Sequence, residues 1–311
     1  MMIKRTAAAL LCAALISLCS CSVGFVDATS VKYDNADKYT AGDIEITDSI
    51  ETLDIDWPTG RLDISSADTQ SVTVKETTKG SLSDKEKVHT WQEGSTLHVR
   101  FCRSGEHYSG EEKQLKVTVP KSTALENVSL HVSSADVSCT GLTAAAAELS
   151  ASSGNLSFEG DAQSLRCESS SGNISFSGNS GDIKAAASSG NVFITQRGRA
   201  QSISAQTSSG EITIDAEYAD KLSAESSSGD KSITLAEISR SVELISSSGD
   251  VKLALPENSD FDMNIDTSSG DISYEMPLSK TGSNSYTCGS GGNMISISTS
   301  SGDVKISSQH R

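Results

Sequence analysis

A short motif, Ser-Ser-Gly followed by Asn, Glu or Asp, recurs eight times between residues 152 and 303 of the 311-residue chain. Successive glycines of the first seven copies lie 18 to 21 residues apart, and the eighth follows after 32 residues. A turn signal at a fixed period near twenty residues is typical of a solenoid, in which each repeat forms one coil and the coils stack. The glycines of the motif, called the repeat glycines below, are Gly154, Gly172, Gly190, Gly210, Gly229, Gly249, Gly270 and Gly302.

Apolar residues keep a fixed register about each repeat glycine, at positions −7, −5, −3, +2 and +4. A period of two indicates strands. Each repeat is therefore predicted to fold as a strand, a tight turn and a second strand, with these side chains facing inward. The −3 position is small in every repeat, as expected where two strands converge and leave little volume. Around Gly210 the inward residues are Ile203, Ala205, Thr207, Ile212 and Ile214.

Two earlier segments, around Gly60 and Ala135, fit the same template without the motif. We therefore expect an all-β solenoid of about ten coils of roughly 19 residues, over residues 50–307, followed by a tail at 308–311. Between these two segments, alternating runs at 72–74, 96–101 and 114–119 predict an inserted β excursion, residues 66–127, that caps the amino-terminal end. The 32-residue gap leaves room for an inserted loop at 279–293.

One repeat departs from the pattern, because Lys231 stands two residues after Gly229 where an inward apolar residue is expected. The second strand of this coil is predicted to slip outward by two residues, so that Ile233 and Leu235 take the inward positions. Such a slip implies a local bulge.

The first twenty residues have the layout of a secretory signal peptide, with Lys4 and Arg5 ahead of an apolar stretch at 7–18 and small residues after it. The stretch is too short to span a bilayer, which needs about 20 residues. Its end, Leu18-Cys19-Ser20-Cys21, resembles the lipobox of bacterial lipoproteins. Cys21 fits better than Cys19, because bulky Leu18 would directly precede cleavage at Cys19.

We therefore predict that residues 1–20 are removed and that Cys21 is lipidated. Residues 21–49 would then form a tether to the outer face of a bacterial membrane or the cell surface. Ordinary secretion, with cleavage near Ala28, is the alternative. The formal net charge of −16 argues against a nucleic-acid partner, since phosphate contacts need clustered Lys and Arg.

Four cysteines lie beyond the export segment, with no metal-ligand spacing. A disulfide is permitted outside the cell, but the four cysteines allow three pairings and the sequence does not choose among them. These residues are Cys102, Cys139, Cys167 and Cys288.

The column directly after the repeat glycines is the candidate binding feature. Its acidic members, a candidate Ca²⁺ ladder of oxygen ligands, are Asp230, Asp250, Asp271 and Asp303. The simpler interpretation is turn chemistry, in which glycine takes a positive φ and the next side chain bonds the local backbone. The paired serines are interpreted as small turn formers.

Histidines and aromatic residues are the remaining candidates. The histidines His89, His98 and His107 are interpreted as solvated loop residues. Trp57, Trp91, Phe101 and Tyr108 form either a glycan-stacking patch or part of the core, and the core is favoured because Trp57 falls on an inward column. Motifs of nucleophilic, metalloprotease and phosphate-binding sites are absent from the sequence, so we predict no catalytic residue and no cofactor.

Taken together, the lipobox, the amino-terminal β region and the tandem Ser-Ser-Gly coils resemble a bacterial family of presumed adhesins, β-strand-repeat domains of unknown function. The resemblance covers residues from about 50 to 307. It implies a cell-envelope protein with a right-handed β-solenoid, and it brings no family active site.

Three functions stay open at this point. The leading hypothesis is a non-enzymatic, lipid-tethered module that binds an envelope or extracellular macromolecule. The second is a polysaccharide-cleaving β-helix enzyme, which short coils and Ser-rich turns argue against. The third is an accessory factor in envelope-stress sensing that acts on a membrane protein beside the lipid anchor.

Overall fold

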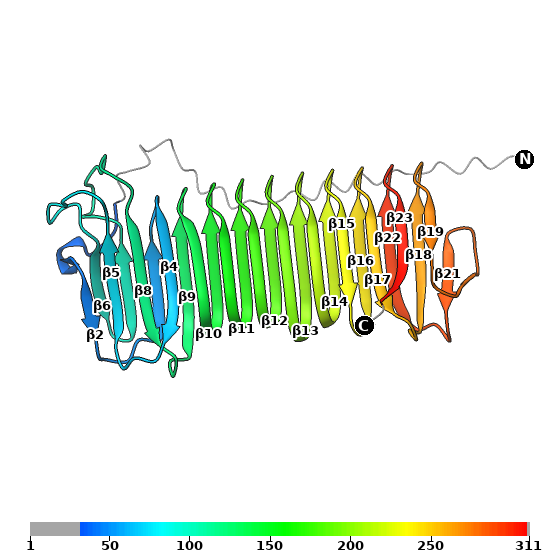
Figure 1. Ribbon diagram of the computed structural model, residues 1–311, viewed down its shortest axis with the longest axis horizontal. Coiled ribbons are helices and arrows are strands. Elements are labelled where there is room, and N and C mark those ends of the chain that lie inside the picture. The colour runs from blue at the N-terminus through cyan, green and yellow to red at the C-terminus, as the bar shows by residue number, and fades with distance from the viewer. Residues whose placement is uncertain (1–31, 310–311) are drawn as a thin grey trace, which may run out of the picture.

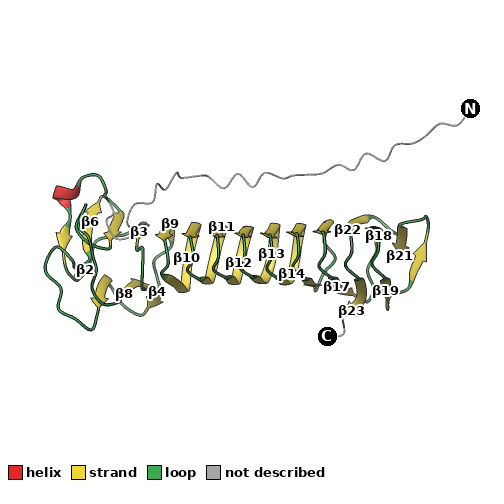
Figure 2. Ribbon diagram, turned by 90° about the horizontal axis from the view of Figure 1, so that it is seen from above, coloured by secondary structure: helices red, strands yellow, loops and turns green. Residues whose placement is uncertain are grey.

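The protein is a long rod of stacked two-stranded coils (Figure 1), described over residues 32–309 by a computed structural model. Each coil contains a strand, a turn and a second strand, and in eight of the coils the turn is Ser-Ser-Gly. Seen from above, the strands lie in two rows that face each other across a narrow core (Figure 2). Within the described residues the one helical element is the short 3₁₀ turn η1 (Ala36–Lys38). The all-β solenoid predicted from the repeat is confirmed.

The two rows are parallel sheets. The post-turn sheet holds the strands that follow the turns, and the pre-turn sheet holds the strands that lead into them. In order along the rod, the post-turn sheet contains β8 (Gln114–Pro120), β4 (Arg61–Ala67), the first halves of β10 (Asp136–Ala151), β11 (Leu156–Ser169), β12 (Ile174–Ala187), β13 (Val192–Thr207) and β14 (Ile212–Ser226), then β15 (Lys231–Leu235), β17 (Val251–Pro256), β23 (Val304–Gln309) and β19 (Ile272–Tyr274). The pre-turn sheet contains β7 (Thr96–Arg100), β3 (Thr52–Asp56), β9 (Leu125–Val132), the second halves of β10 to β14, β16 (Ser241–Ser246), β22 (Asn293–Thr299) and β18 (Phe261–Thr267).

The core is a set of ladders of apolar side chains, in the register that the repeat predicts. In one ladder Leu165, Ile183, Ile203 and Leu222 lie opposite one another in neighbouring coils, and all are buried. Each fully buried side chain of this size contributes about 1.5–3 kcal/mol relative to an exposed one. The stack is therefore held together by burial between neighbouring coils as well as by the strand hydrogen bonds.

The slip expected at Lys231 does not occur. β15 begins at this residue and pairs in register with β14, with Lys231 opposite Ile212. Its side chain is fully buried in the inward column, where Nζ donates a hydrogen bond to Ser226 Oγ at 2.7 Å. The turn explains why the strand cannot shift. Gly229 packs directly against Gly210 of the preceding coil and fixes where β15 starts.

The coils do not stack in sequence order at the carboxyl end. The coil of β22 and β23 lies between the coil of β16 and β17 and the coil of β18 and β19, although both of those precede it in the chain. The intervening residues form the hairpin of β20 (Leu278–Lys280) and β21 (Ser285–Cys288), which pairs antiparallel with β18 and closes this end of the pre-turn sheet. The loop expected at 279–293 is thus a cap.

Coils also stack out of sequence order at the amino-terminal end. The excursion is confirmed as a cap, but β7 and β8 within it form a further coil, stacked outside β3 and β4. Beyond that coil, β6 (His89–Glu93) and β1 (Thr40–Ala41) extend the pre-turn sheet antiparallel. Likewise β5 (Val72–Thr77) and β2 (Ile44–Ile46) extend the post-turn sheet.

Two expected boundaries are therefore wrong. Much of the predicted tether at 21–49 is folded: β1 and β2 belong to the cap, and the Tyr33 hydroxyl donates a hydrogen bond to the carbonyl of Cys102 at 2.9 Å. The expected tail at 308–311 is also shorter, because β23 extends to Gln309, opposite Pro256. In each case, backbone pairing to a neighbouring strand holds residues in the folded rod that look polar and loop-like in the sequence.

Candidate binding surfaces

The turn edge of the rod is a line of close backbone contacts. A Cβ placed on Gly172 would overlap the carbonyl oxygen of Gly154 in the preceding coil, and the other repeat glycines are equally close to their neighbours. Within the described residues, positive φ angles occur at other glycines, such as Gly60, and not at the repeat glycines. The expected positive φ is therefore wrong. These positions require glycine because adjacent coils approach too closely for any side chain.

The residues after these glycines, together with Asp136 after Ala135, form a row along one edge of the post-turn sheet, called the ladder below. At seven steps Oδ1 of one ladder side chain accepts a hydrogen bond from the backbone N–H of the next, at 2.8–3.0 Å. The side chains therefore bond the adjacent coil, not their own turn as expected. In spatial order the ladder is Asp136, Asn155, Asn173, Asn191, Glu211, Asp230, Asp250, Asp303 and Asp271.

The four candidate calcium ligands, Asp230, Asp250, Asp271 and Asp303, lie together at the carboxyl end of the ladder. Each Oδ1 of Asp230, Asp250 and Asp303 is already an acceptor for a backbone N–H. Over residues 32–309, no cluster of three or more His, Cys, Asp or Glu side chains is arranged to hold a metal ion. One free oxygen per coil in a straight row does not surround a cation that takes six to eight oxygens.

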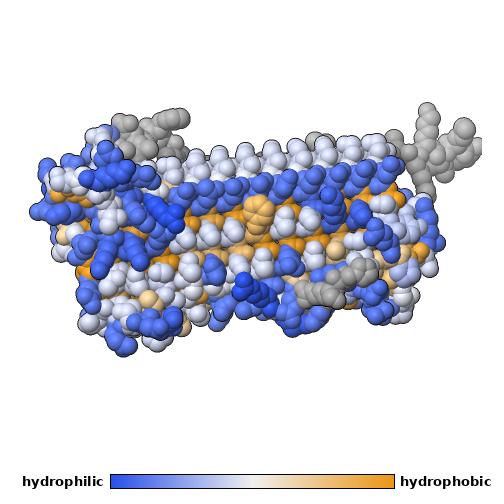
Figure 3. All heavy atoms as spheres, in the orientation of Figure 1, coloured by the Kyte–Doolittle hydropathy of each residue, from blue (hydrophilic) through white to orange (hydrophobic). Residues whose placement is uncertain are grey.

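Below the ladder, the outward face of the post-turn sheet is flat and mainly polar. Figure 3 shows this face, with a blue row of ladder residues beneath the pale row of turns. The next outward column contains mostly Ser and Thr. Phe193 interrupts it, between Ser175 and Thr213, with 38 % of its surface exposed. The sequence analysis missed Phe193, although its outward phase in the period-two pattern is visible in the sequence.

The corner opposite the turns carries a shallow groove of about 540 Å³. Its floor includes Ala144, Ala162 and Ser180, with Glu126 near one end and Arg199 at the other. The groove exists because β13 holds two more residues than β12 at this corner, so that the longer coil projects beyond its shorter neighbours. The guanidinium of Arg199 pairs with Glu237 at 2.6 Å.

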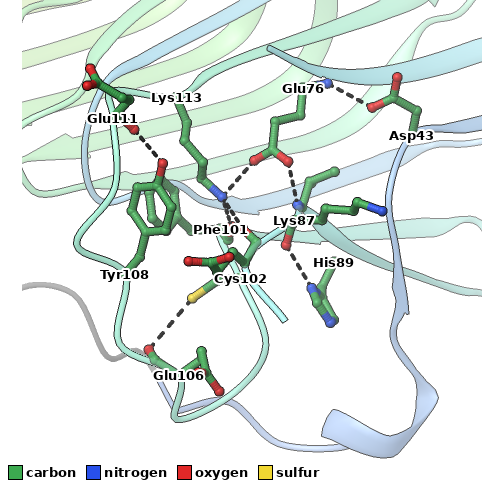
Figure 4. Close-up of polar contacts among 12 residues, drawn as sticks. Asp43, Glu76, Lys87, His89, Phe101, Cys102, Glu106, Tyr108, Glu111 and Lys113 are labelled. Atoms are coloured by element: carbon green, nitrogen blue, oxygen red, sulfur yellow. Dashed lines mark hydrogen bonds and ion pairs between the residues drawn. The ribbon is translucent and has the colours of Figure 1, made fainter. Parts of the chain in front are cut away.

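At the amino-terminal end, the cap contains a buried ion pair (Figure 4). Lys113 Nζ lies 2.6 Å from Glu76 Oε1, and both side chains are almost completely buried. The ammonium also donates hydrogen bonds to the carbonyls of Glu86, at 2.6 Å, and Phe101. The second oxygen of Glu76 accepts a hydrogen bond from the N–H of Val88 at 2.9 Å. The ammonium of Lys113 and both carboxylate oxygens of Glu76 therefore each have a polar partner.

Three aromatic rings surround the same ammonium. Lys113 Nζ lies 3.9 Å from the ring centre of Phe101, 4.9 Å from that of Tyr108 and 5.0 Å from that of Trp57. Burial lowers the pKa of Lys113, and the neighbouring Glu76 opposes that shift. With all three rings buried, this cluster is packing inside the cap and is not a surface for ligands.

A second charged cluster lies on the pre-turn face, where β3 meets β7 of the cap. Asp54 Oδ2 lies 2.6 Å from His98 Nδ1 and 2.5 Å from Arg100 Nη2. Burial opposes ionisation of Asp54, but hydrogen bonds from Arg100 and His98 outweigh it and lower the pKa of this carboxyl. Trp91 stacks on His98, with Tyr39 edge-on to Trp91. This cluster brings the first described residues of the chain against the rod.

Comparison with known proteins identifies the family to which this architecture belongs. The family model of Toastrack DUF4097 matches residues 50–307, which are nearly all of the rod. The chain belongs to the Toastrack family. No functionally curated protein matches it.

Several solved structures are similar to this chain at low identity. A presumed adhesin from Parabacteroides distasonis is 15 % identical, with 90 % of this chain and 100 % of that chain covered and a TM-score of 0.45. A presumed lipid-binding protein from the same organism is 16 % identical, with 88 % and 97 % covered and a TM-score of 0.43. A presumed adhesin from Bacteroides fragilis is 14 % identical, with 88 % and 97 % covered and a TM-score of 0.38.

Two of the three histidines differ from the expected solvated loop residues, whereas His107 of this Toastrack chain lies exposed in a loop, as expected. His89 is buried in β6, and His98 lies in β7 against Asp54. The expected aromatic assignment is correct for Trp57, which lies in the core. Cys21, the predicted lipidation site, falls outside the described residues.

All four cysteines of the Toastrack rod are buried free thiols. Burial raises the pKa of Cys167 to about 12, so this thiol is protonated and unreactive at neutral pH. Cys102 and Cys288 lie in the caps at opposite ends of the rod, which rules out a bond between them within one chain.

Proposed function

We propose that this Toastrack protein is a lipid-anchored, non-enzymatic scaffold of the bacterial envelope that binds a macromolecular partner through the post-turn face. The supporting observation is the face itself, which is flat, repeats at the coil spacing and bears the exposed ring of Phe193 among hydroxyl groups. Cys21 and the lipobox supply the anchor, and the partner is an envelope or extracellular macromolecule.

The anchor is tested by fractionation of cells that express the native chain or Cys21→Ala. We expect native protein in the membrane fraction and the variant in the soluble exported fraction. A variant that still partitions with membranes would overturn lipidation at Cys21.

Binding is tested by a pull-down with the purified protein against cell wall, host matrix proteins and detergent extracts of membranes. We expect saturable capture of one of these fractions. The absence of saturable binding to all three would reject the scaffold function.

A second candidate function, an accessory that acts on a membrane protein in envelope-stress sensing, has its own supporting observation. Residues 33–46 fold onto the cap, and Tyr33 lies beside Arg100 of the Asp54, His98 and Arg100 cluster. A membrane protein that binds next to an anchor at Cys21 would meet this cluster. Capture of one membrane protein, lost in Arg100→Ala and kept in Phe193→Thr, would favour this function.

A further inference from the structure

The ladder changes its chemistry along the rod. Three successive coils carry asparagine (Asn155, Asn173, Asn191), whereas the other ladder positions are acidic. In both stretches Oδ1 accepts a backbone N–H from the adjacent coil. The second polar atom of each side chain therefore sets the hydrogen-bonding character of the edge. It is the donor Nδ2 on asparagine and the acceptor Oδ2 on aspartate.

The amide groups of two of these residues face solvent. Asn155 Nδ2 donates to Asp136 at 3.0 Å. For Nδ2 of Asn173 and Asn191, the structure of residues 32–309 gives no hydrogen bond, and neither side chain is buried. These two coils therefore present unused donors in an otherwise acidic edge.

Phe193 lies directly beside these donors. It is two residues after Asn191 on the same face of β13, and its neighbours across the sheet are Ser175 and Thr213. The other strongly exposed aromatic residue, Tyr274, lies on β19 at the far end of the rod. Phe193, Asn173, Asn191, Ser175 and Thr213, called the asparagine window, thus combine one apolar ring with hydroxyl and amide groups.

We infer that the asparagine window binds an uncharged polysaccharide chain that lies along the rod axis, which rests on the proposed scaffold function and specifies its ligand. A pyranose ring has an apolar C–H face that packs on an aromatic ring, and its equatorial hydroxyls both donate and accept hydrogen bonds. The window supplies an apolar ring and polar groups in the combination that fixes such a ligand.

Spacing and charge favour this ligand over others. Neighbouring coils lie about 4.8 Å apart, close to the advance per sugar in an extended β-1,4-linked chain, so each coil meets one sugar. Glu159, Glu211 and Asp215 border the window on exposed positions. One cation, Arg197, also borders it and donates a hydrogen bond to Ser177 Oγ at 3.0 Å. The three carboxylates outnumber this guanidinium, so the border as a whole repels an anionic chain. The ligand is therefore an uncharged β-linked glycan.

The test uses purified protein titrated with soluble oligomers of β-1,4-glucose and of β-1,4-N-acetylglucosamine, with polygalacturonate as the anionic probe. Phe193→Thr copies the side chain that Thr213 places at the same position in the next coil. Asn173→Asp with Asn191→Asp copies the acidic ladder, which keeps the bond to the adjacent coil and replaces the outward donor. Both changes therefore preserve the fold, which melting temperatures will check.

Each variant is expected to weaken binding of a neutral oligomer about tenfold, since stacking and a pair of hydrogen bonds are each worth about 1–1.5 kcal/mol. The matched control, Asp230→Asn with Asp250→Asn, makes the reverse change outside the window and is expected to leave binding unchanged. Stronger binding of polygalacturonate, no binding of either neutral oligomer, or equal binding by all variants would overturn the inference. Envelope binding that survives in Phe193→Thr would reject the glycan site and leave the scaffold function standing.

Discussion

Two lysines are buried within residues 32–309, and their surroundings differ. Lys113 has a carboxylate, two carbonyls and three aromatic rings around its ammonium. Lys231 has one hydroxyl at 2.7 Å and one carbonyl at 3.5 Å. Burial lowers the pKa of Lys231 to about 8, and Asp230 and Glu225 oppose that shift only in part. The charge of Lys231 therefore destabilises the fold.

Replacement of Lys231 by Met is expected to raise the free energy of unfolding at pH 7 by about 2 kcal/mol, because the unpaired buried charge is removed while the volume is kept. Urea denaturation measures the change. Lys252→Met, at an exposed position one coil away, is the control and is expected to change stability by less than about 0.5 kcal/mol. A less stable Lys231→Met protein would show that the ammonium is well paired.

The same lysine predicts how stability depends on pH. Its pKa is about 8 in the folded state against an ordinary value of 10.5, so the folded protein binds fewer protons between these two pH values. Stability relative to Lys231→Met should therefore rise from pH 8 to pH 10.5, by about 3 kcal/mol in total. Because Lys113 is present in both proteins, the difference isolates Lys231. A constant difference over this range would contradict the assignment.

Substitution of Gly172 by Ala is expected to destabilise the rod by about 3 kcal/mol, because the added Cβ overlaps the carbonyl of Gly154 and forces two coils apart. Gly80→Ala is the matched control, since a Cβ there meets no atom within 4 Å. Thermal unfolding of both variants would compare them. Equal melting temperatures would contradict the close-packing explanation.

At the scale of elements, the buried pair Lys113–Glu76 fastens β5 to the loop that leads into β8. Lys113→Met alone is expected to cost about 3–5 kcal/mol, since it leaves the carboxylate of Glu76 buried without its partner. The double variant Lys113→Met, Glu76→Gln should recover much of that loss. A double-mutant cycle by urea denaturation measures the coupling, and additive losses would show that the pair is not coupled.

Much of the strand pattern could be predicted from the sequence, because the period of two and the repeat glycines act within a single coil. The stacking order of the end coils could not. The coils of Gly249, Gly270 and Gly302 carry nearly the same inward pattern, so any of them can pair with any other, and connecting loops decide between them. The sequence predicts a slip of the strand at Lys231 because a charged residue stands at an inward position. The contact between Gly229 and Gly210 that fixes this strand joins two coils and is not visible in the sequence.

The candidate surfaces were predictable to a similar extent. The position of the ladder follows from the repeat, since every copy carries a polar residue after its glycine. Its bonding does not, because the backbone N–H that donates to each side-chain oxygen belongs to another coil. The outward position of Phe193 follows from the period of two. The partners of Lys113 depend instead on contacts between segments distant in sequence, since Glu76 and Lys113 are 37 positions apart.

At the scale of the whole molecule, the chain has a formal net charge of −16, and one carboxylate oxygen each of Asp230, Asp250 and Asp303 already accepts a backbone N–H from the adjacent coil. Millimolar Ca²⁺ is therefore expected to raise the melting temperature by little, and by no more than NaCl of equal ionic strength, since both act by screening. Calorimetry in the two salts makes the comparison. A rise of many degrees specific to Ca²⁺ would show that the carboxylates bind the ion.

The displaced position of the coil of β22 and β23 also matters for synthesis. A polypeptide emerges from the ribosome amino-terminus first, and the middle coils can stack as they appear because their neighbours are adjacent in sequence. β18 has no inner neighbour until residues 293–299 exist, and β17 gains its outer neighbour from residues 304–309. A prematurely terminated chain thus exposes unpaired strand edges, which invite association with other chains. Closure of these strand edges therefore waits for the coil of β22 and β23, which is synthesised after both of the coils that it joins.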